Sequence, residues 1–526
     1  MKQLWYGGKI YTMEKENETV ESVLVQDDKI IAVGDIQELE SQADEKVNLH
    51  GATMYPGFVD SHLHIIWHGE KLIRLDLSKA TSCEEMLEMV KEAAKRTPCD
   101  QWLFGEGWNE NNFPDRRIPT IQELDAIRKE PIVLNRVCLH QSLVNSSALE
   151  HAGITEQTED PFGGKIGKDQ IGKLNGRLFE KAKELLDTSI PKEGEAYIDY
   201  LENAMDLAIQ DMHSKGLTGG HSEDMSYFGH YTNPLTAYRR VIGKKRHFRA
   251  NLLRHVKVFE EMMNDGVVFD EPFIEPGAMK MFADGALGGS TAALSEPYSD
   301  NQNNKGMFSY TDQQLEDFVQ LARKYQSAVA IHTIGDAAAE QMIQAIEKYP
   351  VPEGQRDRLI HACVLREDLV NRLKKLPVIL DIQPAFVTSD FPWVMERLGE
   401  KRLEWAYAWR KLMDNGLICA NGTDTPIEDV DPIKTIYAAV ERKKPGEDHE
   451  GYLPSEKLTR FEAVQLYTFG SAKAICKEDE RGLIKPGYDA DFTIVDRDLF
   501  DGTSEDMLNA KVVKTVVAGN VVYSNE

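Results

Sequence analysis

The sequence has no long apolar segment and no paired cysteine motif. No apolar run approaches the ~18 residues that a membrane-spanning helix needs, so we expect no membrane partner. The six cysteines are scattered without a Cys-x-x-Cys pair, which indicates reduced thiols rather than a zinc finger or a disulfide framework. The first residues (Met1–Gly7) lack the pattern of a secretory signal, and we therefore expect a cytoplasmic protein.

Positive charge is also scarce. The chain of 526 residues has 61 Lys and Arg against 87 Asp and Glu, which gives a formal net charge of -26. Such an acidic surface disfavours nucleic acid as a partner, and its simplest role is solubility. Internal repeats and low-complexity segments are missing, and 41% of the residues are hydrophobic. The length therefore suits roughly two to four domains, or one large barrel with additions.

Both ends of the chain carry short strand patterns with hairpin signals. Four candidate strands precede residue 53, and Asp491–Val495 and Val512–Val517 repeat the same style near the other end. Neither end has many strands by itself. We therefore predict one small composite β-sandwich built from residues 1–53 and 480–526.

Between the two ends, short apolar strand candidates alternate with helical patterns such as residues 311–325 and 336–349. This alternation is typical of a parallel α/β fold. Eight candidates suffice to close a (β/α)8 TIM barrel, which we predict over residues 54–479. The eight candidate strands are Met54–His62, Leu217–His221, Phe248–His255, Ala278–Asp284, Ala328–His332, Arg358–Cys363, Val378–Gln383 and Leu417–Asp424.

A long insertion interrupts the predicted barrel. Roughly 150 residues separate its first two strands, which is too long for a simple βα connection. This stretch has strand-like pieces at Gln101–Gly105 and Pro131–Val137 and a helical pattern at Glu84–Arg96. We therefore predict an inserted α/β subdomain over about residues 70–210, placed over the barrel mouth.

The most informative stretch is Tyr55–His64, where a short apolar run ends in His62 and His64. In an extended segment, side chains at i and i+2 point to the same side, so two imidazoles converge as a metal ion requires. A lone His-x-His pair is a weak signal, because such pairs occur by chance on surfaces. Other candidate strands, however, also carry ligand or catalytic residue types, namely Lys280, His332, His361 and Asp424.

Reactive groups of a TIM barrel collect at the C-terminal ends of its strands, so these residues are expected to meet. Each has a structural alternative: a histidine after a strand is more often a core residue, Lys280 could extend to solvent, and Asp424 could cap a turn. Jointly they indicate a hydrolytic metal site. Lys280 must lose its proton or become a carbamate before it can bind a metal. Asp424 can take a proton from a metal-bound water and pass it to a leaving nitrogen.

Several motifs, taken in combination, resemble a known family. They lie at residues 7–13, 56–64, 280–288, 291–294, 296–298, 332–336, 383–384, 423–426, 431–432 and 482–491. With them the chain resembles the amidohydrolase superfamily nearly from end to end. Within it, the chain is most similar to the amidohydrolase-3 branch, the YtcJ-like and N-substituted formamide deformylase-like proteins.

The resemblance implies a metal-dependent hydrolase of carbon–nitrogen bonds on a (β/α)8 barrel. It implies a divalent metal, with zinc expected, as one or two ions, since branch members differ in metal number. Lys280 would be a bridging, carboxylated lysine, and Asp424 would be both a ligand and the catalytic acid–base. The implied metal ligands are His62, His64, Lys280, His332, His361 and Asp424.

Four residues are candidates for substrate binding, and one of them, His221, lies where the chain departs from the pattern of the branch. Arg136 and His140 lie in a stretch similar to a motif of the branch, and His140 would polarise a substrate carbonyl, with a structural histidine as the alternative. Trp108 would line the pocket, or equally belong to a core. His221, at the end of the second strand, is a candidate specificity residue.

We predict an amidohydrolase that cleaves a non-peptide C–N bond, in an amide or an N-substituted formamide, through metal-activated hydroxide. Its partner would be a small-molecule amide, and a homodimer is a family-level expectation. The nearer alternative is a deaminase or cyclic-amide hydrolase on the same scaffold, with Glu340 after the fifth strand as its acid. The other is a catalytically silent scaffold protein, against which the full set of ligand types argues.

Overall fold

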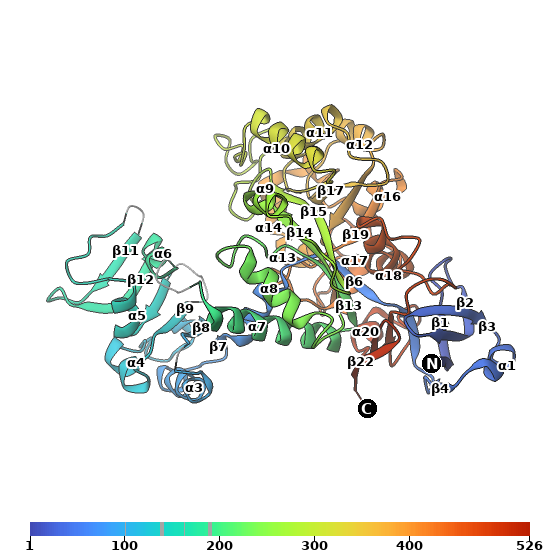
Figure 1. Ribbon diagram of the computed structural model, residues 1–526. Helices are drawn as coiled ribbons and strands as arrows, with labels where there is room; N and C mark the ends of the chain where they lie inside the picture. The colour runs from blue at the N-terminus through green and yellow to red at the C-terminus, as the bar shows by residue number, and fades with distance from the viewer. Residues whose placement is uncertain (100, 137–140, 162–163, 188–191, 526) are drawn as a thin grey trace. The chain divides into compact units, whose positions relative to one another are not determined.

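The computed structural model describes residues 1–99, 101–136, 141–161, 164–187 and 192–525. The chain divides into two compact units, Met1–His68 with Leu201–Glu526, and Gly69–Tyr200. The first unit holds a barrel and a sheet built from both termini, and the second unit holds a separate sheet (Figure 1).

The barrel consists of eight parallel strands, so the predicted (β/α)8 fold is confirmed. Each barrel strand is hydrogen-bonded to the barrel strand that follows it in the sequence, from β6 to β19. The ring closes just after β19, where the backbone N–H of Asp424 donates to the carbonyl of His62 at 2.8 Å. The strands are β6 (Phe58–Leu63), β13 (Leu217–Ser222), β14 (Arg249–His255), β15 (Ile274–Phe282), β16 (Val329–Thr333), β17 (Asp357–His361), β18 (Val378–Ile382) and β19 (Ile418–Asn421).

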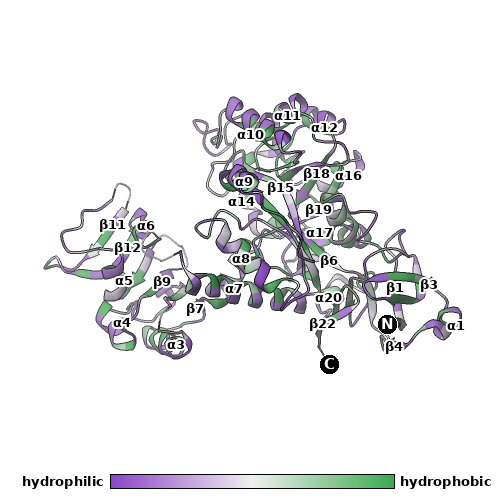
Figure 2. Ribbon diagram, in the orientation of Figure 1, coloured by the Kyte–Doolittle hydropathy of each residue, from purple (hydrophilic) through white to green (hydrophobic). Residues whose placement is uncertain are grey.

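Helices follow the barrel strands, and the two that were predicted from the sequence each bury an apolar side. The two helical patterns at residues 311–325 and 336–349 are confirmed as α10 (Asp312–Lys324) and α11 (Asp336–Lys348). Helix α10 starts with a reciprocal capping box between Thr311 and Gln314, which satisfies two free backbone donors. Both helices carry hydrophilic and hydrophobic residues side by side, as a helix between core and solvent requires (Figure 2).

The remaining helices of the first unit follow the barrel strands or lie near the terminal sheet. They are α1 (Ile36–Leu39), α2 (Ile65–Ile73, which runs into the second unit), α8 (Thr232–Val241), α9 (Val256–Asn264), α12 (Glu367–Leu373), α13 (Phe386–Asp390), α14 (Trp393–Leu398), α15 (Glu400–Leu403), α16 (Trp409–Asp414), α17 (Pro432–Glu441), α18 (Arg460–Gln465), α19 (Ser471–Ala474) and α20 (Ser504–Leu508). Helix α7 (Glu195–Ser214) begins in the second unit and ends in the first.

Strands from both ends of the chain form one sheet of eight strands. The antiparallel pair β5–β20 joins the N-terminal part to the C-terminal part. The strands are β1 (Lys2–Tyr11), β2 (Thr19–Gln26), β3 (Lys29–Gly34), β4 (Glu45–Asn48), β5 (Thr53–Pro56), β20 (Phe492–Val495), β21 (Val512–Val517) and β22 (Asn520–Ser524).

The predicted first barrel strand, Met54–His62, is wrong at its start. Residues Thr53–Pro56 form β5 of the terminal sheet, and the barrel strand β6 begins only at Phe58. Gly57 separates the two, and its backbone N–H donates to the carbonyl of Asp491 at 2.8 Å. A continuous apolar run therefore serves two different sheets.

Gly57 has no room for a side chain. A Cβ at this position would lie 2.4 Å from Thr218 Oγ1 and 2.9 Å from the Cβ of Asp491. We expect Gly57→Ala to destabilise the protein by about 1–3 kcal/mol, measured as a lower Tm, because overpacking a tight site forces neighbours apart. The control is Gly288→Ala, whose Cβ would meet only Trp393 at 3.8 Å. Equal Tm values for both variants would contradict this prediction.

Asp498 anchors the terminal sheet. It accepts hydrogen bonds from Tyr11 at 2.7 Å and Tyr55 at 3.0 Å, and it pairs with Lys9 at 2.6 Å. Burial alone raises the pKa of Asp498, but the hydrogen bonds, that from Lys9 first, lower it below 3.8. Since the folded pKa lies below the unfolded one, this carboxylate stabilises the fold above its unfolded pKa, and the contribution is lost as the pH falls through the folded pKa.

We therefore expect the Tm gap between wild type and Asp498→Asn to be largest near neutral pH and to shrink as the pH falls toward about 3. Thermal scans across this pH range measure the gap. Asp501→Asn, which removes a nearby exposed carboxylate, serves as the control and should show no such trend. A constant gap for Asp498→Asn at all pH values would be the opposite result.

The second unit is an inserted α/β subdomain with a six-stranded sheet in the order β11-β12-β10-β9-β8-β7. The strand and helix patterns predicted in this segment appear as β8, β9 and α3. The elements are β7 (Leu75–Asp76), β8 (Leu103–Trp108), β9 (Ile132–Arg136), β10 (Gln141–Val144), β11 (Gly164–Lys168), β12 (Leu174–Glu180), α3 (Cys83–Arg96), α4 (Ile121–Ile127), α5 (Ser146–His151) and α6 (Glu184–Asp187). Among the described residues of the whole chain, no helix has the length and apolar character to cross a bilayer.

Candidate metal centre

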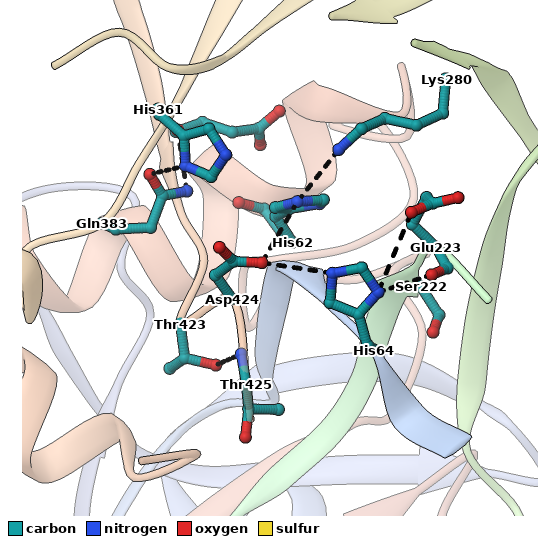
Figure 3. Close-up of polar contacts among 12 residues, drawn as sticks. His62, His64, Ser222, Glu223, Lys280, His361, Gln383, Thr423, Asp424 and Thr425 are labelled. Atoms are coloured by element: carbon teal, nitrogen blue, oxygen red, sulfur yellow. Dashed lines mark hydrogen bonds and ion pairs between the residues drawn. The ribbon is translucent and has the colours of Figure 1, made fainter. Parts of the chain in front are cut away.

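Three of the residues singled out from the sequence meet at one point of the barrel. His62 lies in β6, His64 follows that strand, and Asp424 follows β19. One ligand atom of each lies within 4.8 Å of those of the other two. The Oδ1 atom of Asp424 is 3.3 Å from His64 Nε2 and 3.6 Å from His62 Nε2 (Figure 3). This geometry is the tightest grouping of potential metal ligands among the described residues.

Lys280 reaches the same point from β15. Its Nζ atom lies 3.2 Å from His62 Nε2, and the side chain is fully buried. Burial lowers the pKa of Lys280 from 10.5, while the charges of Glu223 and Asp424 oppose the shift. A buried lysine with a lowered pKa more readily provides a neutral amine, the form that can bind a metal or react.

His332 and His361 lie beside this cluster but outside the tight group of three. The ring of His361 is 5.6 Å from that of His62, and the rings of His332 and His361 are 4.5 Å apart, centroid to centroid. His332 Nε2 lies 3.0 Å from the carbonyl oxygen of Gly285. The structure thus brings all six predicted ligand residues into one neighbourhood, and their coordination of a metal stays a prediction.

Hydrogen bonds fix the rings of two histidines. His64 Nδ1 lies 2.6 Å from the carbonyl oxygen of Glu223, and His361 Nδ1 lies 2.8 Å from Gln383 Oε1. Both oxygens only accept, so each Nδ1 is the donor and each Nε2 is left with a free lone pair in the neutral ring. Gln383 is itself oriented by donating to the carbonyl of Asp381 at 3.0 Å. Such partners orient metal-binding histidines in known sites.

The electrostatics favour neutral imidazoles at three positions. Burial lowers the pKa of His62 and of His332 well below 6.5, and it lowers the pKa of His361 to about 4. At His64, burial also acts to lower the pKa, but the hydrogen bond and charge of Asp424 outweigh it and raise the pKa above 6.5. Burial acts to raise the pKa of Asp424, but its contact with His64 and the charges of His361 and Lys280 lower it below 3.8. Asp424 is therefore ionised at neutral pH.

Two of these residues have strained backbones. His361 has a φ of 76° and Asp424 a φ of 57°, in the left-handed region that non-glycine residues rarely adopt. Both lie where a barrel strand gives way to its loop. Such conformations persist only where the surroundings enforce them, and they cluster at functional sites.

Two buried aspartates near the site were not assigned a role from the sequence. Asp284 accepts backbone N–H groups from Ala293, Ile334 and Gly335 at 2.8–3.0 Å, and burial raises its pKa to about 7. Asp60 also has its pKa raised to about 7 by burial. Both aspartates lie inside the family-like motifs at residues 280–288 and 56–64. Membership of these motifs was the sequence signal that could have pointed to them.

Of the four candidate substrate-binding residues, Trp108 and Arg136 lie in the second unit and His221 lies in β13 of the barrel. Trp108 is fully buried in the core of the second unit and donates its indole N–H to the carbonyl of Leu134 at 3.1 Å. Arg136 pairs with Glu110 at 2.8 Å. His140 lies outside the described residues. Trp108 thus lies in a core, which was the alternative to a place in the pocket. The substrate-binding roles of all four residues stay predictions.

His221 is buried in the barrel wall and lines a cavity of about 20 Å³. The same cavity is lined by Arg249, Asn251 and Asp491, and none of its lining residues is a predicted metal ligand. Burial lowers the pKa of His221 well below 6.5, so its ring is neutral. Its role as a specificity residue stays a prediction.

Comparisons with known proteins agree with this geometry. A model of the Amidohydrolase family matches residues 45–523. The chain is 45% identical over 533 residues to YtcJ of Bacillus subtilis (strain 168), covering 99% of both chains. It is 27% identical to the N-substituted formamide deformylase of Arthrobacter pascens, covering 98% of this chain and 97% of that one.

A solved structure is similar over almost the whole chain. It is described as an uncharacterized metal-dependent hydrolase from Pyrococcus furiosus, with a TM-score of 0.82 and 28% identity, and the match covers 95% of this chain and 100% of that one. The family match spans the barrel with its cluster of histidines, lysine and aspartate, and the part of the terminal sheet from β4 onward. The chain therefore belongs to the amidohydrolase family and is a hydrolase of that superfamily.

Proposed function

We propose that the protein is a metal-dependent hydrolase that cleaves a non-peptide C–N bond in an amide or an N-substituted formamide. The observation that carries this proposal is the convergence of His62, His64 and Asp424 within 4.8 Å, with Lys280 beside them. The similarity to a formamide deformylase and to a metal-dependent hydrolase supports the choice of reaction.

The donor set fits a divalent cation. Imidazole nitrogens and a carboxylate oxygen are the ligands that Zn²⁺ accepts, and three of the four histidines have pKa values lowered by burial. His62, His64 and Asp424 would hold the first ion. His332 and His361 would hold a second ion, or complete the shell of a single one, and Lys280 would be a further ligand.

A second ion would need a change at Lys280. The neutral amine could add carbon dioxide and release a proton, and the resulting carbamate of Lys280 would offer oxygen ligands to both ions. The neighbouring carboxylates of Glu223 and Asp424 favour the ammonium form instead. We propose carboxylation only together with the two-metal state, and intact-mass measurement of the loaded protein distinguishes the two states.

When bound, a divalent cation supplies a hydroxide nucleophile near neutral pH and polarises the substrate carbonyl. The chain itself supplies the proton transfer. Asp424 is ionised at neutral pH, so its carboxylate can accept the proton of the attacking water and then donate it to the leaving nitrogen. The hydrogen bonds at His64 and His361 keep the rings oriented during these steps.

The alternative of a deaminase with Glu340 as acid has less support. Glu340 lies in α11 and pairs with Arg366 at 2.8 Å, which occupies its carboxylate. A homodimeric state is a proposal that rests on the family resemblance alone. A cytoplasmic location is a proposal that rests on the six scattered cysteines, which indicate reduced thiols. The substrate is proposed to be a small molecule.

A substrate panel tests the proposal. Purified protein loaded with zinc would be incubated with N-substituted formamides, acylated amines, cyclic amides and aminopurines, and released amine, formate or ammonia would be measured. Amine release from a formamide or an open-chain amide supports the proposal. Turnover confined to cyclic amides or aminopurines would favour the alternative hydrolase or deaminase instead.

A further inference from the structure

The residues on either side of Asp424 are both anchored to other parts of the barrel. Asp424 itself has a left-handed backbone, with a φ of 57°, and its N–H donates to the carbonyl of His62 at 2.8 Å. Its neighbours Thr423 and Thr425 are almost completely buried, at 0% and 1% exposure. The orientation of the Asp424 carboxylate therefore depends on what holds these two threonines.

Asp60 holds the threonine before Asp424. Its carboxylate accepts the hydroxyl of Thr423 at 2.6 Å and the backbone N–H of Thr423 at 3.1 Å. The same carboxylate accepts the backbone N–H of His62 at 3.0 Å. One buried carboxylate thus ties a predicted metal ligand on β6 to the residue that precedes Asp424.

A chain of three side chains holds the threonine after Asp424. Thr425 Oγ1 lies 3.1 Å from His68 Nδ1, and His68 Nε2 lies 2.9 Å from Asp211 Oδ2. Because a carboxylate only accepts, Nε2 carries a proton, and in the neutral ring Nδ1 accepts the hydroxyl of Thr425. The backbone carbonyl of Thr425 also accepts the N–H of His64 at 3.0 Å.

The two anchors are connected. The backbone N–H of Thr425 donates to the hydroxyl oxygen of Thr423 at 3.3 Å, so the network runs continuously across Asp424 (Figure 3). Its outer members come from different elements: Asp60 from β6, His68 from α2 and Asp211 from α7. A strained residue is thus fixed on both sides by groups that are not themselves predicted ligands.

We propose that Asp211, His68 and Thr425 act as positioning residues, which hold the Asp424 carboxylate in register with His62 and His64. This inference rests on the proposed function, because it assigns Asp424 to metal binding and proton transfer. Asp211 is 27% exposed in its side chain, and it lies 2.9 Å from the nearly buried ring of His68. The carboxylate orients His68, as in other carboxylate–histidine pairs near metals.

The test is a cobalt titration of the metal-free protein, followed by visible absorption. We expect Thr425→Val to weaken Co²⁺ binding about 10–100-fold and to change the cobalt spectrum, since loss of orienting partners has effects of this size. Thr425→Ser keeps the hydroxyl and should restore both. Asp211→Asn, at a partly exposed position that tolerates change, should weaken binding in the same direction.

The matched control is Thr515→Val. Thr515, in β21 of the terminal sheet, is also fully buried. Its hydroxyl donates to the backbone carbonyl of His213 at 2.6 Å. Thr515→Val should lower the Tm, as Thr425→Val does, but it should leave the Co²⁺ affinity and the visible spectrum of bound cobalt unchanged. Wild-type affinity and spectrum in both Thr425→Val and Asp211→Asn would overturn the inference and leave the proposed function standing. Wild-type protein that binds no cobalt would overturn both.

Discussion

Asp424→Asn is expected to lower kcat by about 10²–10⁴-fold, the usual contribution of a positioned acid–base group. Asparagine has nearly the same shape as aspartate, but it cannot accept the proton of the attacking water. The substitution also removes the negative charge of Asp424, whose Oδ1 lies 3.3 Å from His64 Nε2. Steady-state hydrolysis of the best amide substrate measures the effect, with zinc content determined on the same sample.

The control for this variant is Asp429→Asn. Asp429 pairs with Lys434 at 2.8 Å on the same loop region, and its side chain is 64% exposed. Its loss should leave kcat unchanged. If Asp424→Asn keeps its metal but loses turnover, the proton-transfer role is separated from the ligand role. Full activity of Asp424→Asn would rule out both roles.

Replacing the predicted metal ligands His62 and His64 should change both the metal content and the thermal stability of the protein. We expect wild-type protein to contain one or two zinc-like ions per chain, and His62→Ala/His64→Ala protein to contain none. A ligand that binds only the folded state adds about 4 kcal/mol to the free energy of unfolding when its concentration is 1,000 times its Kd. The variant should therefore lose the rise in Tm that added zinc gives to the wild type.

Elemental analysis and thermal scans with and without zinc measure this prediction. His449→Ala is the control, because His449 is partly exposed and pairs with Glu447. The affinity should also fall as the pH falls, since Asp424 raises the pKa of His64 and a proton on His64 competes with the metal. Metal-free wild-type protein, even after expression with added zinc, would favour a silent scaffold instead.

The barrel was predictable because its strands are short apolar runs at regular spacing, and several end in residues with metal chemistry. His332 and His361 illustrate this: each ends a buried run and lies next to the other in space. The boundary at Gly57 was missed, because the apolar run continues across it and only the pairing partners change. Local sequence does not reveal which sheet a strand joins.

The contacts that hold the site in place were not predictable in the same way. His68 and Asp211 are 143 positions apart, and neither belongs to a motif whose chemistry points to the other. Trp108 shows the converse: its motif fitted a pocket and a core equally well, and only the fold places its indole in a hydrophobic core. Long-range pairing depends on the assembled fold, which single-sequence patterns do not encode.

The antiparallel pair of β5 with β20 bears on how the protein is made. β5 leads directly into β6 and its histidines, yet its hydrogen-bonding partner is Phe492–Val495. Because the ribosome delivers the N-terminal part first, β5 emerges long before that partner exists. A nascent chain therefore carries β5 without this antiparallel partner until the last segment has been synthesised. Products that end between β19 and β20 would hold all eight barrel strands but an incomplete terminal sheet, and the quality-control machinery of the cell would meet them with β5 lacking this partner.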